Sequence, residues 1–169
     1  MRSWDRGIDY EYAYTMLTRL LHSNDTTTKC YSAVLLLQLR NGLRVGEAVD
    51  AFKTFIKTGK REFNIRVEKK KKPDERLVVV PVELDDNIRF GCIDLAPLPK
   101  NTLVNRVKNW CRQKLGFNTH SLRYAFITYL LRQGVNPSII AKITHHSKLD
   151  FILSYTQSKT AENVLRSLT

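Results

Sequence analysis

Apolar residues that recur at three- and four-residue steps predict that helices make up most of the chain. The first such set begins at Ile8 and ends before the polar cluster SNDTTT. A second helix is predicted to start at Thr26 or Thr27, and because its residues 31–39 are apolar nearly all round, it should lie buried at the centre. It ends at an Asn-Gly pair, so Gly42 marks a sharp turn that delivers Arg44 to a new short helix.

The middle of the chain changes to the composition of β-strands. The segments FKTFI, EFNIRVE and ERLVVVPVE are short and rich in β-branched and aromatic residues, and TGKR and KKKKPD separate them. They predict a small antiparallel sheet of three strands whose second turn carries the lysine run. The next stretch, DDNIRFGCIDLAPLPK, is predicted to be irregular or weakly structured, and its prolines favour a loop that crosses the surface.

The last part of the chain returns to helical spacing. Helices are predicted from about Lys100 to Leu115, from a cap at Thr119 to about Gln133, and over NPSIIAKIT. A short helix should carry Tyr155, and TAENVLRSL forms a final amphipathic segment. The fold class is therefore α+β and mainly α-helical, with the small sheet on one side. Residues 1–7 are interpreted as a leader or linker remnant and residues 8–169 as one domain.

Charge narrows the class of partner. Lys and Arg number 28 against 16 Asp and Glu, which gives a formal charge of +12 and a sequence pI of about 9.8. Such an excess favours a polyanion, most simply a nucleic acid. The apolar runs are too short to span a bilayer, and the N-terminus is not a signal peptide, so no membrane partner is expected and the location is predicted to be intracellular.

The three cysteines, Cys30, Cys92 and Cys111, are odd in number and widely spaced. This arrangement predicts neither a disulfide framework nor a metal site, and it favours free thiols in a reducing compartment. The four histidines likewise make no metal-spaced cluster with carboxylates.

His120 and Arg123 lie three residues apart in the first turn of a predicted helix, and therefore on one face of it. Exposed N–H groups and the helix dipole favour an anion there, and the planar guanidinium can donate two hydrogen bonds to phosphate oxygens. Taken alone, the pair is weak evidence for a phosphate site, because a histidine and an arginine at this spacing more often belong to a solvated helix face.

The order of the motifs adds a family resemblance. The last part of the chain resembles the C-terminal motif of the tyrosine recombinases, also called the phage-integrase family. The resemblance lies in the order and spacing of four segments, HSLRYAFITYLL, GVNP, ITHHS and SYT, with His146 nine residues before Tyr155. Upstream, NGLRVGEAV resembles the family's box with its first arginine, which would be Arg44, and its acidic member, which would be Glu47. The segment NIRVEKKKKPDERLVVVP resembles the β-hairpin that presents the catalytic lysine.

The resemblance implies a role for each matching residue. Tyr155 would attack a DNA phosphodiester and form a covalent 3′-phosphotyrosyl link, which leaves a free 5′-hydroxyl. Arg44 and Arg123 would hold the nonbridging oxygens, and His120 and His146 would hydrogen-bond the same phosphate. No cofactor, metal ion or ATP is required, because the covalent link stores the bond energy for rejoining.

A hairpin lysine would protonate the departing 5′-oxygen. Different ways of aligning the hairpin favour Lys71, Lys70 or Lys72, and Lys71 is preferred. Lys69, Lys70 and Lys72 are then expected to bind DNA phosphate.

Two positions depart from the family pattern: His145 stands where the family usually has glycine, and Tyr124 stands where a histidine or lysine often follows the arginine. The family's separate N-terminal DNA-binding domain has no counterpart before Ile8.

The resemblance implies a site-specific recombinase or integrase of a mobile element, and the integrases of archaeal viruses are one such type. Its partner would be a double-stranded DNA attachment site, on which it would assemble as a tetramer while being weakly associated or monomeric in the absence of DNA. It would be DNA-associated in the cytoplasm or nucleoid of the host cell.

Three other functions fit part of the pattern. A type IB topoisomerase shares the nucleophile and the arginines, but it relaxes DNA of any sequence. A non-catalytic DNA-binding module would use the basic residues alone, with Tyr155 structural. A metal-dependent nuclease would need EDTA-sensitive activity.

Overall fold

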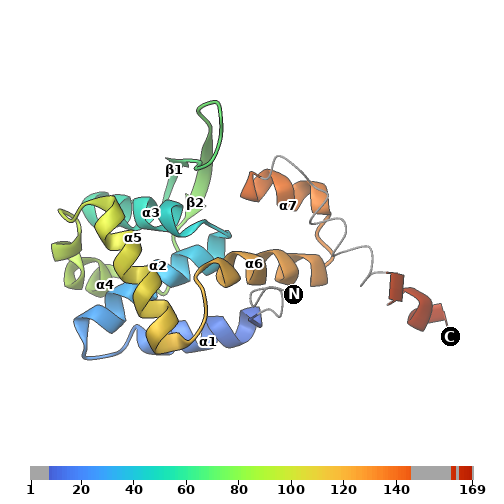
Figure 1. Ribbon diagram of the computed structural model, residues 1–169, viewed down its shortest axis with the longest axis horizontal. Coiled ribbons are helices and arrows are strands. Elements are labelled where there is room, and N and C mark those ends of the chain that lie inside the picture. The colour runs from blue at the N-terminus through green and yellow to red at the C-terminus, as the bar shows by residue number, and fades with distance from the viewer. Residues whose placement is uncertain (1–7, 146–160, 163, 169) are drawn as a thin grey trace.

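The computed structural model describes residues 8–145, 161–162 and 164–168, and within these residues it is mainly helical with one two-stranded sheet. Figure 1 shows a compact helical body from which the β-hairpin projects, with helix α7 (Pro137–Thr144) beside it. No helix of the described part is both long and apolar enough to cross a membrane.

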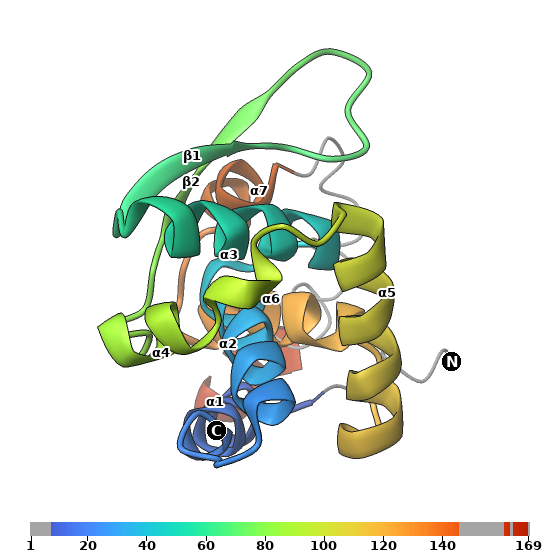
Figure 2. The same ribbon diagram turned by 90° about the vertical axis from the view of Figure 1, so that its left-hand side faces the viewer.

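Helix α2 (Thr26–Asn41) forms the centre of the body, as its apolar sequence predicts (Figure 2). Helices α1 (Tyr10–Leu20) and α3 (Val45–Thr58) pack against it, as does α6 (His120–Arg132). All residues from 30 to 39 are buried. The Asp25 side chain accepts a hydrogen bond from the Thr28 N–H, which fixes the start of α2 at the predicted residue.

The turn after α2 has the sharp geometry expected of it. Gly42 has a φ of +66°, and a Cβ atom at this position would lie 2.3 Å from the Phe126 ring, so only glycine fits. The chain leaves the turn with Arg44 at the N-cap of α3. The turn therefore places Arg44 next to α6, the helix of Arg123.

The prediction of three strands is wrong, because the segment FKTFI belongs to α3. Phe52, Phe55 and Ile56 are fully buried and continue the three- and four-residue spacing that Ala48 and Val49 begin, so one helical face holds them all. The β-branched and aromatic composition of FKTFI is equally typical of a strand, but the spacing of its apolar residues fits the helix.

The two remaining strands pair as predicted. Strands β1 (Glu62–Arg66) and β2 (Glu75–Val79) are antiparallel, with Glu62 opposite Val79 and Arg66 opposite Glu75. The lysine run lies in the connection between them. Next along the chain, the predicted irregular loop instead contains a short helix, α4 (Asp86–Gly91), and a 3₁₀ turn, η2 (Ile93–Leu95). The helix forms because the Asp85 side chain accepts a hydrogen bond from the Ile88 N–H and caps it.

Cys30 and Cys92 form a disulfide, which corrects the prediction of free thiols. They are 62 residues apart in the sequence, but α2 packs against α4 and brings their Cα atoms to 5.7 Å. Only this long-range packing pairs them. Cys111 is a buried free thiol, and burial raises its pKa to about 12.

The three helices predicted between Lys100 and Thr144 are present in the predicted order. Helix α5 (Lys100–Trp110) continues into a π-helical turn, η3 (Cys111–Leu115). Thr119 stands at the N-cap of α6, but its side chain makes no capping hydrogen bond. Residues 164–168 are helical. The helix predicted to carry Tyr155 lies outside the described residues.

Candidate active site

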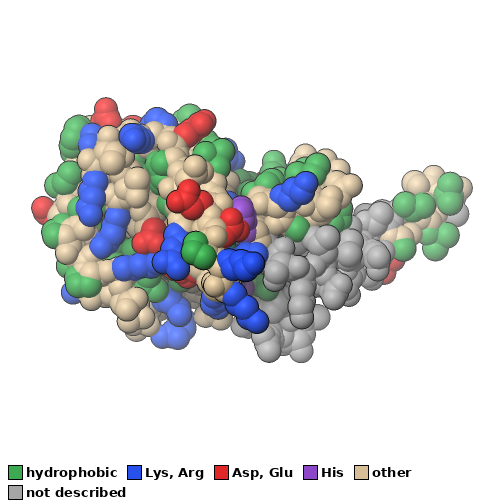
Figure 3. Space-filling view, turned by 90° about the horizontal axis from the view of Figure 1, so that it is seen from above, with side chains coloured by type: hydrophobic (Ala, Val, Ile, Leu, Met, Phe, Trp, Pro, Cys, Tyr) green, Lys and Arg blue, Asp and Glu red, His purple; other side chains and the backbone are tan. Residues whose placement is uncertain are grey.

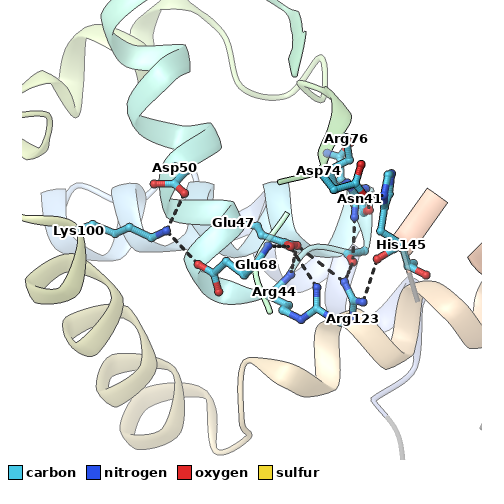
Figure 4. A network of polar contacts seen from close by, with 12 residues as sticks. Asn41, Arg44, Glu47, Asp50, Glu68, Asp74, Arg76, Lys100, Arg123 and His145 are labelled. Atoms are coloured by element: carbon cyan, nitrogen blue, oxygen red, sulfur yellow. Dashed lines mark hydrogen bonds and ion pairs between the residues drawn. The ribbon is translucent and has the colours of Figure 1, made fainter. Parts of the chain in front are cut away.

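The carboxylate of Glu47 is fully buried and connects the start of α3 to the hairpin turn that follows β1 (Figure 4). Its Oε1 accepts a hydrogen bond from the Arg44 backbone N–H at 2.9 Å. Its Oε2 accepts from Arg44 Nη1 at 3.1 Å and from the Glu68 N–H at 3.0 Å. Three donors from two segments therefore fix one carboxylate, and that carboxylate orients the Arg44 side chain.

Arg123 reaches the same carboxylate from α6. Its Nη1 lies 3.8 Å from Glu47 Oε1 and donates to the Gly42 carbonyl at 2.8 Å, while its Nη2 donates to the Thr144 carbonyl at 3.1 Å. Only 1 % of the residue is exposed. The fold thus brings together the two arginines that the sequence singled out, but Arg123 is buried rather than part of a solvated helix face.

Arg76 is a third arginine of this cluster, and the sequence interpretation missed it. It is 3 % exposed and donates to the carbonyl oxygens of Asn41 and Gly42. In β2 the inward positions are Arg76 and Val78, whereas Glu75, Leu77 and Val79 face outward. Because side chains alternate between the two faces of a strand, Arg76 falls on the same face as the apolar Val78. This alternation was the signal in the sequence that could have revealed a buried arginine.

The cluster carries three guanidinium charges, from Arg44, Arg76 and Arg123, against the single carboxylate of Glu47. Burial is the main cause that lowers the pKa of Arg76 and of Arg123, in each case to about 10. Both groups remain charged at neutral pH. Because like charges repel strongly in a poorly solvated region, the arrangement favours a bound anion that would balance the excess.

An open groove of about 630 Å³ lies beside this cluster. Arg44 reaches it from the start of α3, and His120 reaches it from the first turn of α6. The remaining lining residues come from α3, the hairpin, α5, η3 and the segment before α6: Val45, Gly46, Glu68, Lys69, Lys100, Asn101, Val104, Lys108, Arg112, Asn118 and Thr119. Figure 3 shows Lys and Arg side chains on one face of the body, with acidic side chains and a histidine among them.

His120 has an exposed edge and is surrounded by cations. Partial burial, followed by the nearby charges of Arg123, Lys69, Arg44 and Lys108, lowers its pKa to about 4. The imidazole is therefore neutral at pH 7 and has one donor and one acceptor nitrogen. Its ring packs edge-on against Tyr124, with centroids 4.9 Å apart.

Among the hairpin lysines, Lys69 lines the groove. Its backbone has a φ of +60°, an uncommon left-handed conformation for a residue with a side chain. Lys70 is half-buried, and Lys71 and Lys72 are exposed without lining the groove. The structure therefore brings Lys69, rather than the preferred Lys71, next to Arg44 and His120.

The hairpin also contacts the end of α7. His145 has a φ of +57°, which explains why a glycine suits this position, and its Nδ1 lies 2.6 Å from Asp74 Oδ2. This hydrogen bond is the main reason that the pKa of Asp74 is lowered. His145 is thus engaged with the hairpin. His146 and Tyr155 lie outside the described residues.

Gly46 allows the hairpin to approach α3 closely. A Cβ atom at this position would lie 1.9 Å from the Glu68 carboxylate, which Lys100 holds at 2.9 Å while also contacting Asp50 at 2.7 Å. These contacts fix one wall of the groove. Within the described part of the chain, no three His, Cys, Asp or Glu side chains gather so as to hold a metal ion.

Comparison with known proteins reveals relatives in viruses and archaea. The chain is 38 % identical over 170 residues to "Putative integrase ORF241" of Acidianus two-tailed virus, an alignment that covers 98 % of this chain and 69 % of the relative. It is 30 % identical over 201 residues to "Uncharacterized protein MJ0770" of Methanocaldococcus jannaschii, covering 98 % of this chain and 89 % of that protein.

A third relative, "Putative integrase V10" of Sputnik virophage, is 29 % identical over 201 residues, which cover 96 % of this chain and 89 % of the relative. No family model and no solved structure matches the chain. The 38 % identity to the Acidianus virus protein extends over nearly the whole chain and indicates common descent. This chain therefore belongs to the same protein family as "Putative integrase ORF241".

Proposed function

We propose that this chain is a tyrosine-type site-specific recombinase, which cleaves and rejoins DNA strands through a covalent bond between Tyr155 and a 3′-phosphate. The observation that carries the proposal is the convergence of Arg44 and Arg123 on one buried carboxylate, beside a basic groove that Arg44 and His120 line. Membership of an integrase family supports DNA recombination as the general process.

The arginines have different roles in this proposal because they differ in exposure. Arg44 is oriented by Glu47 and opens to the groove, so its guanidinium binds the nonbridging oxygens of the phosphate. Arg123 is buried next to the same Glu47 carboxylate and contributes positive charge without facing the groove directly. Direct contact of Arg123 with phosphate requires its guanidinium to leave the carbonyl of Gly42 or Thr144.

The chemical step moves one phosphoryl group and two protons. The phenol oxygen of Tyr155 attacks phosphorus, the bond from phosphorus to the 5′-oxygen breaks, and a hairpin lysine protonates the leaving 5′-oxygen. A histidine accepts the phenol proton, and neutral His120 has an acceptor nitrogen for this purpose. Attack by a 5′-hydroxyl on the phosphotyrosine reverses the step and rejoins a strand. The sequence favours Lys71 as the acid, with Lys70 and Lys72 as alternatives, and His146 as a second phosphate ligand. Lys69 is a further candidate for the acid, because it lines the groove.

The partner in this proposal is a double-stranded DNA attachment site, on which four copies assemble. The formal charge of +12 and the basic groove support a polyanionic partner. Neighbouring subunits would then exchange strands by the same reversible chemistry.

A suicide substrate tests the covalent step. DNA spanning the attachment site is nicked close to the cleavage point, so that the short 5′-hydroxyl fragment diffuses away and the adduct accumulates. After denaturation and protease treatment, wild-type protein should leave a peptide on the 3′-phosphate, with EDTA present. Tyr155→Phe should leave none, and Tyr12→Phe, which changes an exposed tyrosine on α1, should match the wild type.

Three results would contradict the proposal. An adduct in the Tyr155→Phe variant would exclude Tyr155 as the nucleophile. Cleavage abolished by EDTA would indicate a metal-dependent nuclease. Relaxation of supercoiled plasmids without regard to sequence would indicate a topoisomerase.

A further inference from the structure

One stripe of α5 and its π turn faces the groove beyond the arginine cluster. Asn101, Val104, Lys108 and Arg112 all line the groove, and their steps of three, four and four residues place them on one helix face. Two cations therefore extend the basic lining away from Arg44 and along the helix. None of the roles assigned above involves these two residues.

The end of α5 departs from regular helix where Arg112 lies. The Gly116 N–H donates to the Cys111 carbonyl at 3.0 Å, which is the five-residue hydrogen bond of a π-helix. Such single turns occur frequently at functional sites, because the extra residue turns the following side chains relative to a regular helix. Arg112 Nη2 donates to Asn109 Oδ1 at 2.9 Å, and the side chain still reaches the groove lining.

The charges of the groove are unbalanced toward its α5 side. Glu68 is the single acidic residue in the lining, and Lys100 already pairs with it at 2.9 Å. Lys108 is close enough to His120 to contribute to the lowering of its pKa, so the two ends of the groove are electrostatically continuous. Lys108 and Arg112 are both exposed and available to a ligand in the groove.

We propose that Lys108 and Arg112 together bind a second phosphate of the DNA strand, next to the phosphate held by Arg44 and His120. The two residues lie one helical turn apart, about 6 Å along the axis, so both side chains can reach one phosphate group. This second contact aligns the strand along α5. The inference rests on the proposed function for its substrate, DNA, but does not depend on covalent chemistry.

The salt dependence of DNA binding tests this contact. The probe is a 30-base-pair duplex of arbitrary sequence, with affinity measured by fluorescence anisotropy over a range of NaCl concentrations. Each phosphate contact contributes about 0.9 to the slope of log affinity against log salt. Lys108→Gln/Arg112→Gln should lower that slope by at least about 0.9. Arg19→Gln/Lys60→Gln removes the same charge at exposed residues outside the groove and should leave the slope unchanged.

The two ideas fail in different ways. Equal slopes for the groove variant and the charge-matched control, with both variants retaining the wild-type melting temperature, would overturn the second phosphate site. Adduct formation on the suicide substrate is measured in parallel. If the wild-type protein forms no adduct while the slopes differ as expected, the covalent mechanism fails and the phosphate site stands.

Discussion

Arg76 and Arg123 donate to the same acceptor, the carbonyl oxygen of Gly42, at 3.5 Å and 2.8 Å. One arginine comes from the hairpin and the other from α6. The turn that delivers Arg44 is therefore held from two sides. The Asn41 side chain adds a third tie, because its amide exchanges hydrogen bonds with the backbone N–H and carbonyl of Val79.

Replacing Arg76 should destabilise the protein through this turn. Arg76→Met fills a similar space but leaves the buried carbonyl of Asn41 without this donor, so we expect the free energy of unfolding to fall by about 1–3 kcal/mol. Urea denaturation measures the change. Arg66→Met, at an exposed position on β1, is the matched control and should stay within about 0.5 kcal/mol of wild type. Equal stability of the two variants would mean that Arg76 does not hold the turn.

Removing the charge of Glu47 should have a larger effect. Glu47→Gln keeps the shape but leaves Arg44, Arg76 and Arg123 without their shared counter-charge, and the loss of one member of a buried ionic group costs about 3–5 kcal/mol. Urea denaturation again gives the value. Sulfate should raise the melting temperature of this variant more than that of wild type, compared with NaCl of equal ionic strength, because an anion in the groove offsets the excess charge.

The control for Glu47 is Glu62→Gln, at an exposed carboxylate of β1. If both variants lose the same small amount of stability, and sulfate acts on them equally, Glu47 is not the electrostatic centre of the cluster.

Breaking the Cys30–Cys92 disulfide should lower the thermal stability strongly. The bond closes a loop of 62 residues, and loop-closure entropy predicts a contribution of about 4 kcal/mol, or roughly 10 °C in melting temperature. The comparison is between oxidised and reduced protein of the same sequence. In denatured, unreduced protein, only Cys111 should react with an alkylating reagent. Alkylation of all three cysteines would contradict the disulfide.

The hairpin lysines should not contribute equally to cleavage. Because Lys69 lines the groove, we expect Lys69→Ala to reduce cleavage of the suicide substrate by about 10²-fold or more if this residue is the general acid, and Lys71→Ala to cost much less. A 5′-thiol leaving group needs no protonation and should restore the rate of the affected variant. The largest loss at Lys71, with thiol rescue there, would instead support the alignment of the hairpin motif.

The titration of His120 should report on the cations around it. Its lowered pKa of about 4 means that between pH 4 and about 6.5 the unfolded chain binds a proton at this position that the folded chain does not. The contribution of His120 to stability is therefore complete above pH 6.5 and is lost as the pH falls toward 4.

NMR of the imidazole ring measures this pKa directly. Lys69→Gln should raise it, because a nearby positive charge is removed, and Lys60→Gln, outside the groove, should not. Duplex DNA should also raise it, because phosphate neutralises the surrounding cations. If Lys69→Gln leaves the pKa unchanged, Lys69 does not lie close to His120. If DNA leaves it unchanged, His120 does not lie close to the bound DNA.

Local patterns in the sequence were sufficient to predict most of the helices, the hairpin and the turn at Gly42. They also singled out Arg44, Glu47 and Arg123, which the structure brings together. Each of these features depends on residues close together in the chain, where helical spacing, turn residues and family-like motifs can be recognised. The segment FKTFI misled the interpretation because its composition fits a strand while its spacing fits the helix that it continues.

The tertiary structure alone decided which distant segments meet. Packing of α2 against α4 pairs Cys30 with Cys92, and docking of the hairpin buries Arg76 and brings Lys69 to the groove. These relations depend on long-range contacts that no local pattern encodes. The sequence could identify charged residues with the right chemistry, but only the packed chain determined which of them are buried around Glu47 and which face the groove.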